Sequence, residues 1–302
     1  MNKTKIEWCD SSWDPVTGCL HGCEYCYARR IAEWFGKKVP DFSGYPISHG
    51  GHMVDNKFDS NPYPFLFEPT FHAYRLDEPQ RKAKPQTIFV CSMADLFGDW
   101  VPTQLIVEVL DACEAATQHR YMFLTKNPER YAQLDRLALL PHRDNFWYGS
   151  TITSKSSQRF NGTISLNTFL SIEPLHEYLD VGLGSFGGDR LIIIGAETGN
   201  RAGKITPEKA WVDNICEAAD LTHAAVFMKD SLIPIMGEEN MRREKPWEKV
   251  EEPSITATDE ELNRDAEEIA REMGLALAPK TSLSQQEPEW AQNFRQRFEK
   301  VE

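Results

Sequence analysis

Six short apolar runs, separated by stretches of helical pattern, restrict the fold of this chain more than any other feature. Each run is continuously apolar rather than alternating, which is typical of strands covered on both faces, as in parallel sheets. Strands that alternate with helices predict βαβ units with right-handed crossovers. The runs are Thr87–Ser92, Tyr121–Thr125, Phe146–Thr151, Thr168–Ile172, Leu191–Gly195 and Ala225–Lys229.

The stretches between the runs predict helices. Apolar residues recur at helical spacing in Gln104–Gln118, and Pro207–Leu221 follows the candidate N-cap Thr206 with a proline at its first position. An earlier strand is expected at Trp13–Thr17, which gives about seven strands. The sequence therefore predicts an α/β fold, either an open doubly wound sheet or, as the strand number favours, a partial (β/α) barrel that is similar to a TIM barrel.

Two segments interrupt this pattern. Residues 38–85 are rich in proline, glycine, histidine and aromatic residues, and we interpret them as an insertion after the first helix. Its His49 and His52 are a candidate metal pair, although histidines flanked by glycines are more often part of a surface loop. Beyond the barrel domain, residues 1–249, apolar stripes at helical spacing predict a helical C-terminal extension, residues 250–302.

The charge of the chain argues against a protein that binds extended nucleic acid. The 302 residues include 46 acidic and 33 basic side chains, a net charge of −13, whereas affinity for a duplex comes from Lys and Arg that neutralise phosphates. No apolar run is long enough to span a bilayer, and the first residues lack the apolar core of a signal peptide. We therefore expect a cytoplasmic protein whose seven cysteines are thiols or metal ligands.

Three of the cysteines lie close together with the spacing C-x3-C-x2-C, just before the predicted helix Glu24–Gly36. A tight loop of this kind can direct three thiolates to a [4Fe–4S] cubane, which usually has four thiolate ligands. Three ligands leave one iron open for a small molecule. Zinc is the alternative, with His21 or Cys9 as the fourth ligand, although structural zinc sites usually combine two C-x2-C pairs and this chain has one. The three cysteines are Cys19, Cys23 and Cys26.

The cysteine motif, with the aromatic Tyr25 before its last cysteine, resembles the signature of the radical S-adenosylmethionine (SAM) superfamily. Five stretches are similar, in order, to a phage-associated radical SAM family with a three-cysteine motif and no assigned function: IEWCDSSWDPVTGC, PQTIFVCSMADLFG, FLTKNPERY, SIEPL and IIIGAETG. This resemblance covers about residues 4–248. A weaker resemblance, to spore photoproduct lyase, rests on the same motif and on residues after the second and third strands: Cys91, Ser92, Asp95, Thr125 and Lys126.

The resemblance implies a [4Fe–4S] cluster on Cys19, Cys23 and Cys26 whose open iron binds the amino and carboxylate groups of SAM. An electron from a donor such as a flavodoxin or ferredoxin would cleave the sulfonium bond of SAM. The resulting 5′-deoxyadenosyl radical would take a hydrogen atom from a small molecule, a nucleotide or a peptide. The protein would orient the cofactors and exclude water.

Active sites of barrels lie at the C-terminal ends of the strands, and this rule selects further candidates. After the second and third strands, Ser92 and Asp95 are suited to bind the amino group of SAM, and Lys126 to neutralise its carboxylate. Tyr25, from the cysteine motif itself, is a further candidate for binding the cofactor.

The later strands provide the candidates for the nucleoside part of SAM. Thr151 and Thr153 follow the fourth strand and are possible ribose contacts, while Glu173 follows the fifth and is suited to the ribose hydroxyls or the amino group. After the sixth strand come Gly195 and Glu197, where a small residue would let the adenine approach the backbone.

Cys91 is the candidate catalytic residue, because a thiol beside the SAM site can return a hydrogen atom to a product radical. The alternative is an ordinary core cysteine, for which an apolar strand is the expected place. Three classes of function remain open at this point. They are a radical SAM enzyme with a small substrate, radical repair or modification of nucleic acid, and a zinc-stapled binding module without catalysis.

Overall fold

The computed structural model describes residues 1–35, 47–48, 51–54, 62–162, 165–181 and 185–248. Contacts divide the chain into two units, Met1–Glu248 and Lys249–Glu302, and the second unit lies outside the described residues. The predicted helical extension, residues 250–302, therefore stays a prediction, and His49 of the candidate metal pair also lies outside the described part. No helix among the described residues is long and apolar enough to cross a membrane.

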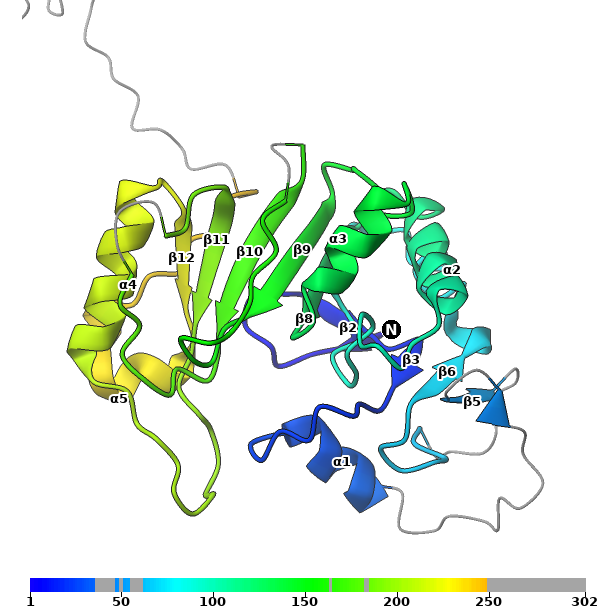
Figure 1. Ribbon diagram of the computed structural model, residues 1–302, viewed down its shortest axis with the longest axis horizontal. Helices are drawn as coiled ribbons and strands as arrows, with labels where there is room; N and C mark the ends of the chain where they lie inside the picture. Colours follow the sequence, from blue (N-terminus) through cyan, green and yellow to red (C-terminus); the bar gives the residue numbers. More distant parts are fainter. Residues whose placement is uncertain (36–46, 49–50, 55–61, 163–164, 182–184, 249–302) are drawn as a thin grey trace, which may run out of the picture. The chain divides into compact units, whose positions relative to one another are not determined.

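An eight-stranded sheet is the main element of the first unit (Figure 1). Its strands follow the order β1-β2-β7-β8-β9-β10-β11-β12, and all neighbours are parallel except β1 and β2. The prediction of an α/β fold with a large, mostly parallel sheet is confirmed, and the six predicted strands lie within two residues of the observed bounds. The strands are β1 (Asn2–Lys3), β2 (Ser11–Trp13), β7 (Thr87–Val90), β8 (Arg120–Thr125), β9 (Phe146–Thr151), β10 (Asn167–Ile172), β11 (Asp189–Ile194) and β12 (Ala225–Met228).

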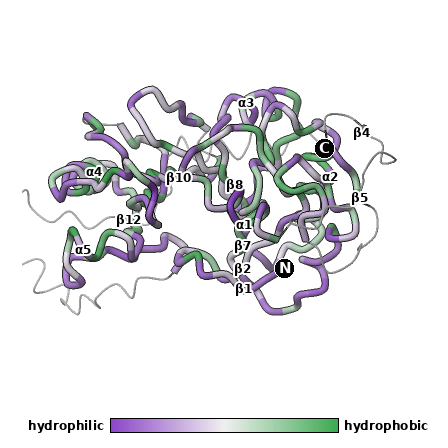
Figure 2. Tube along the Cα trace, turned by 90° about the horizontal axis from the view of Figure 1, so that it is seen from below, coloured by the Kyte–Doolittle hydropathy of each residue, from purple (hydrophilic) through white to green (hydrophobic). Residues whose placement is uncertain are grey.

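Both faces of this sheet are covered, which explains why its strands are continuously apolar. One face packs against helices: α2 (Thr103–Glu114) and α3 (Glu129–Arg136) cover β7–β9, while α4 (Lys209–Leu221) and α5 (Ile233–Met236) cover β10–β12. Figure 2 views the strands from their C-terminal side and shows hydrophobic and hydrophilic residues alternating along α4, as in an amphipathic helix. The other face is filled by Trp8, Phe89, Met122, Trp147, Phe169, Leu191, Ile193 and Phe227.

The helix bounds differ from the predicted ones for local reasons. The predicted helix Glu24–Gly36 is α1 (Tyr27–Phe35), because the chain first makes a turn in which the Cys26 amide donates to the Cys23 carbonyl. Helix α4 begins after Glu208, which is extended and is the N-cap in place of Thr206. The predicted helix Gln104–Gln118 is α2, which begins and ends earlier. Among the described residues no helix connects β9 to β10 or β10 to β11, so strand and helix do not alternate throughout.

The predicted strand Trp13–Thr17 is two strands that belong to different sheets. Trp13 ends β2, and β3 (Val16–Thr17) opens a second sheet. Pro15 lies between them and has no N–H to donate to a ladder, although its carbonyl accepts from the His72 amide at 2.7 Å. The second sheet has the order β3-β6-β5-β4, with strands β6 (Thr70–His72), β5 (Gly51–Val54) and β4 (Ile47–Ser48) from the predicted insertion. This sheet fixes the chain just before Cys19.

Candidate functional site

A pocket of about 220 Å³ lies where the C-terminal ends of β7–β12 meet the cysteine loop, residues 18–26. Parallel strands end at the same edge of a sheet, so polar residues from distant parts of the sequence converge there. Every predicted site residue lines this pocket except Cys91, Thr153 and Gly195. The polar lining consists of Cys19, His21, Cys23, Tyr25, Cys26, Tyr27, Ser92, Asp95, Thr125, Lys126, Thr151, Ser171, Glu173, Glu197, Thr198 and Lys229.

The cysteine loop is held by backbone contacts at its start. The Gly18 amide donates to the Met93 carbonyl at 2.9 Å, and the Cys19 amide donates to the Phe67 carbonyl at 3.2 Å. Gly18 has a φ of +85°, and a Cβ atom there would lie 2.2 Å from the Glu68 carbonyl oxygen, so this position requires glycine. The loop therefore enters the pocket on a path that the segments after β7 and before β6 define.

Three free, partly buried thiols line the pocket. The Arg29 amide donates to Cys26 Sγ at 3.3 Å, and the Arg29 guanidinium donates to the Cys19 carbonyl at 3.3 Å. Burial raises the pKa of the Cys19 thiol to about 12, and neighbouring Asp95, Cys23 and Cys26 add to this rise. Within the described residues, no group of three or more His, Cys, Asp or Glu side chains has the arrangement of a metal site. Because a thiol whose pKa is raised in this way is protonated at neutral pH, a cation bound by Cys19 would displace its proton.

Asp95 connects the cysteine loop to the ends of two strands. Its Oδ2 accepts hydrogen bonds from His21 Nε2 at 2.7 Å and from the Lys126 amide at 2.9 Å. Its Oδ1 accepts from the Phe97 amide at 3.0 Å, and the residue is only 4% exposed. The carboxylate lies in the predicted place, but its partners are protein groups.

Ser92 is held in place by a buried residue that was not among the predicted site residues. Asp14, buried between β2 and β3, accepts hydrogen bonds from Ser92 Oγ at 3.0 Å and from the Met93 amide at 2.9 Å. Burial raises the pKa of Asp14, and these two hydrogen bonds oppose the rise. The sequence does contain a signal for Asp14: it directly precedes Pro15, and a proline breaks a buried strand.

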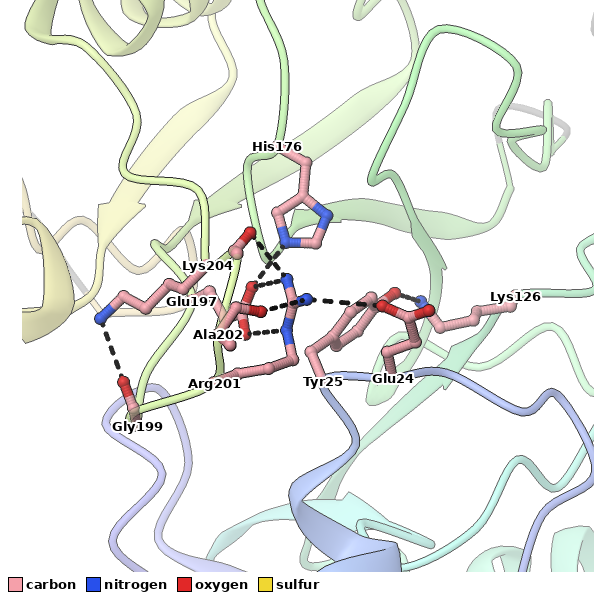
Figure 3. Close-up of polar contacts among 10 residues, drawn as sticks. Glu24, Tyr25, Lys126, His176, Glu197, Gly199, Arg201, Ala202 and Lys204 are labelled. Atoms are coloured by element: carbon pink, nitrogen blue, oxygen red, sulfur yellow. Dashed lines mark hydrogen bonds and ion pairs between the residues drawn. The ribbon is translucent and has the colours of Figure 1, made fainter.

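Tyr25 contacts residues from two strand ends across the pocket (Figure 3). Lys126 Nζ donates to the Tyr25 hydroxyl at 3.1 Å and lies 5.4 Å from the centre of its ring. On the other side, the His176 ring meets the Tyr25 ring edge-on, with 5.2 Å between the ring centres. Tyr25 thus bridges the ends of β8 and β10, and among the described residues no carboxylate forms an ion pair with the Lys126 ammonium.

Glu197 belongs to a second group of charged side chains that reaches the cysteine loop. Arg201 donates to both carboxylate oxygens of Glu197, at 2.7 and 2.8 Å, and His176 Nε2 lies 3.1 Å from Oε2. The same guanidinium donates to Glu24 at 3.4 Å (Figure 3). Hydrogen bonds from Arg201, and then from His176, lower the pKa of Glu197 below its usual range.

Glu173 forms an ion pair with Lys229, a lining residue at the end of β12 that the sequence reasoning did not select. A Cβ atom on Gly195 would lie 3.2 Å from both side chains. Gly195 therefore leaves room for this ion pair, whereas we expected it to leave room for adenine. Thr153 also lies off the pocket lining, where its amide donates to Ser157 Oγ at 3.1 Å.

Cys91 is 2% exposed and packs in the core between the sheet and α2 rather than in the pocket lining. Its φ of +59° ends β7, so the alternation of strand side chains does not continue through this residue. Burial raises its pKa well above the usual range, and it lies close enough to Cys113 of α2 to affect that thiol. The hydrogen-donor role stays a prediction to which this position lends no support.

The fold and pocket define an α/β protein whose largely parallel sheet carries a cysteine-rich pocket at its C-terminal edge. The chain belongs to the family described as "Protein of unknown function (DUF5131)", whose model matches residues 3–247. No curated protein matches the sequence. Among solved structures, a cysteine-to-serine mutant of spore photoproduct lyase is similar at 12% identity and a TM-score of 0.46, over 76% of this chain and 79% of that chain. A double mutant of the same lyase, with bound AdoMet and dinucleoside spore photoproduct, is similar at 14% identity and a TM-score of 0.40, over 73% and 64%.

Proposed function

We propose that this protein is a radical SAM enzyme with the partial (β/α) barrel of that superfamily. Cys19, Cys23 and Cys26 would hold a [4Fe–4S] cluster, and SAM would lie between the cluster and the ends of β7–β11. The observation that carries the proposal is that these three cysteines line one pocket together with Lys126 and the other strand-end residues. The resemblance of the sequence motifs to a phage-associated radical SAM family points the same way.

The number and chemistry of the donors, three thiols, are those that a cubane with one open iron requires. The three thiols are free and face one pocket, and a backbone amide donates to Cys26 Sγ, as amides do to cluster-bound sulfurs. When bound, the cluster would supply the electron that cleaves SAM and, through its open iron, a binding site for the SAM amino acid group. The residues around it would set its hydration and orient its ligands.

Lys126 is the residue best placed to receive the SAM carboxylate. Of the two lysines in the lining, Lys229 is neutralised by Glu173, whereas Lys126 contacts the Tyr25 hydroxyl and ring. An ammonium without a carboxylate partner in a partly closed pocket attracts an anion strongly. Tyr25 would hold the ammonium in place until the carboxylate arrives.

The opposite wall would hold the nucleoside part of SAM. Thr151 and Glu197 line the pocket at the ends of β9 and β11, and we propose that they contact the ribose or the adenine edge. Ile6, Trp8, Phe67 and Phe89 make the remainder of the lining apolar, which excludes water from a reactive site.

We infer that the substrate is a small molecule, a nucleotide or a peptide, because a net charge of −13 disfavours affinity for extended duplexes, which comes from Lys and Arg that neutralise phosphates. A flavodoxin or ferredoxin is the proposed electron donor, and the cytoplasm the proposed location. Action on a nucleic acid component, as in a lyase-like repair reaction, is the second candidate.

Reductive cleavage of SAM tests the proposal. The protein is purified and reconstituted without oxygen, reduced with dithionite, and analysed for 5′-deoxyadenosine and methionine by chromatography. We expect both products in equal amounts and slow formation even without substrate. A colourless protein with tightly bound zinc and no product would make it a zinc-stapled module instead.

A further inference from the structure

The carboxylate of Asp95 receives three hydrogen bonds from three different parts of the chain. His21 lies in the cysteine loop, Phe97 follows β7, and the Lys126 amide ends β8. A carboxylate has about four acceptor positions, so three donors leave little capacity for another. The Asp95 side chain is only 6% exposed, which leaves little surface for a ligand.

The two partners on Oδ2 lie beside the two groups that the proposed function requires. His21 lies two residues from both Cys19 and Cys23, and Lys126 carries the ammonium proposed to bind the SAM carboxylate. One oxygen atom therefore connects the cysteine loop to the end of β8. Because two of the three bonds come from backbone amides, they fix the path of the chain rather than a side-chain rotamer.

The His21 ring also contacts an aromatic ring. The Trp100 ring meets it edge-on, with 4.8 Å between the ring centres. A histidine that contacts both an aromatic ring and a buried carboxylate is restricted in orientation, like the histidines that outer carboxylates orient in metal sites. Here the oriented histidine belongs to the loop that carries the thiols.

We propose that Asp95 is a positioning residue that sets the distance between the cysteine thiols and Lys126, and that it acts through His21 and the Lys126 backbone rather than by touching SAM. The inference rests on the proposed function, because this distance matters only if the thiols hold a cluster and Lys126 binds SAM. It replaces the expectation that Asp95 binds the SAM amino group. Loss of either partner should loosen the loop, so His21 and Asp95 should act as a unit.

A double-mutant cycle of His21→Phe and Asp95→Asn tests this inference. His21→Phe keeps an aromatic ring against Trp100 and removes the hydrogen bond, and circular dichroism checks that each variant folds. The readouts are the rate at which a chelator removes iron and the affinity for SAM in equilibrium dialysis, neither of which needs turnover. We expect each single change to speed iron loss about 10-fold or more and to weaken SAM binding several-fold, with no further loss in the double variant.

A matched control is available elsewhere in the molecule. His142 Nε2 and Asp135 Oδ1 are also 2.7 Å apart, but this pair is more exposed and does not line the pocket. His142→Phe should change neither readout.

Two results would overturn the inference. In the first, Asp95→Asn weakens SAM binding while His21→Phe has no effect, which would make Asp95 a direct SAM ligand. In the second, both variants behave like His142→Phe. If the wild-type protein holds zinc in place of iron, the proposed function fails, and the same cycle measured by zinc release still decides the role of Asp95.

Discussion

The two sides of the pocket hold their carboxylates in different ways. On the cysteine side, formed by the cysteine loop and the ends of β7 and β8, Asp95 accepts from two backbone amides and one histidine. On the far side, formed by the ends of β10–β12, Glu173 and Glu197 accept from the side chains of Lys229, Arg201 and His176. A backbone bond holds a chain in place, whereas a side-chain pair can exchange its partner for a ligand. We therefore expect the cysteine side to be the more rigid of the two, and the far side to rearrange when a ligand binds.

Accessibility follows the same division for the Glu173–Lys229 pair and for the cation that binds Glu197. Lys229 and Glu173 retain side-chain exposures of 16% and 26%, compared with 6% for Asp95. Glu197 itself is as buried as Asp95, at 3%, but its partner Arg201 retains 25%. Partly exposed ion pairs contribute little free energy to folding because solvent screens them. We therefore expect substitutions on the cysteine side to have larger effects than equivalent substitutions on the far side.

The largest loss should follow removal of a thiol. Replacing Cys19, Cys23 or Cys26 with Ala should remove most of the bound iron, because each thiolate is expected to hold a different iron. Iron and sulfide content after anaerobic reconstitution measures the loss. Cys216→Ala is the control, since this partly buried cysteine lies on α4 outside the pocket. Equal iron loss in Cys9→Ala would point to four cysteine ligands and no open iron.

A smaller effect is expected from the ammonium on the cysteine side. Lys126→Ala should weaken SAM binding by about 1–3 kcal/mol, roughly 5- to 150-fold, because a charge-assisted hydrogen bond to the carboxylate is lost. Isothermal titration of the iron-loaded protein measures the affinity, and iron content should stay at the wild-type level. Lys229→Ala is the matched change on the far side and should weaken SAM less. If Lys229→Ala weakened SAM binding more than Lys126→Ala, the roles assigned to the two sides would have to be exchanged.

The smallest effect is expected on the far side. Glu197→Gln keeps an oxygen that can accept from Arg201 or His176, and the Arg201 guanidinium of the weakened pair is partly exposed to solvent, so SAM affinity should fall less than about threefold. Asp95→Asn makes the same chemical change on the cysteine side and should reduce the affinity for SAM more. Equilibrium dialysis of both variants against SAM measures the two affinities. A loss in Glu197→Gln as large as that in Asp95→Asn would break the comparison between the two sides.

The strands and the meeting of the cysteines with the strand ends could be predicted from the sequence. Continuously apolar runs such as Phe146–Thr151 can be satisfied only between two covered faces, and parallel strands bring their last residues to one edge. That rule selected Lys126 and Glu197 without knowledge of their contacts. It also placed Asp95 in the pocket, where its hydrogen-bond partners are His21 and two backbone amides.

The remainder depended on contacts that no local pattern encodes. The break at Pro15 divides one predicted strand between two sheets. Cys91, whose positive φ follows the end of β7, packs in the core and not in the pocket lining. His21 was considered only as a fourth zinc ligand and Lys229 was not selected, because their contacts are with partners 74 and 56 residues away in the sequence. Side-chain pairing across loops is set by tertiary packing, which sequence periodicity does not describe.

The electron paramagnetic resonance spectrum of the reduced, iron-loaded protein, recorded before and after addition of SAM, tests the central claim most directly. The three-cysteine site predicts the signal of a reduced [4Fe–4S] cluster whose g values shift when SAM binds the open iron, and no such signal in Cys26→Ala. A cluster signal that saturating SAM leaves unchanged would contradict an open iron. A protein that binds zinc and gives no signal would contradict the cluster itself.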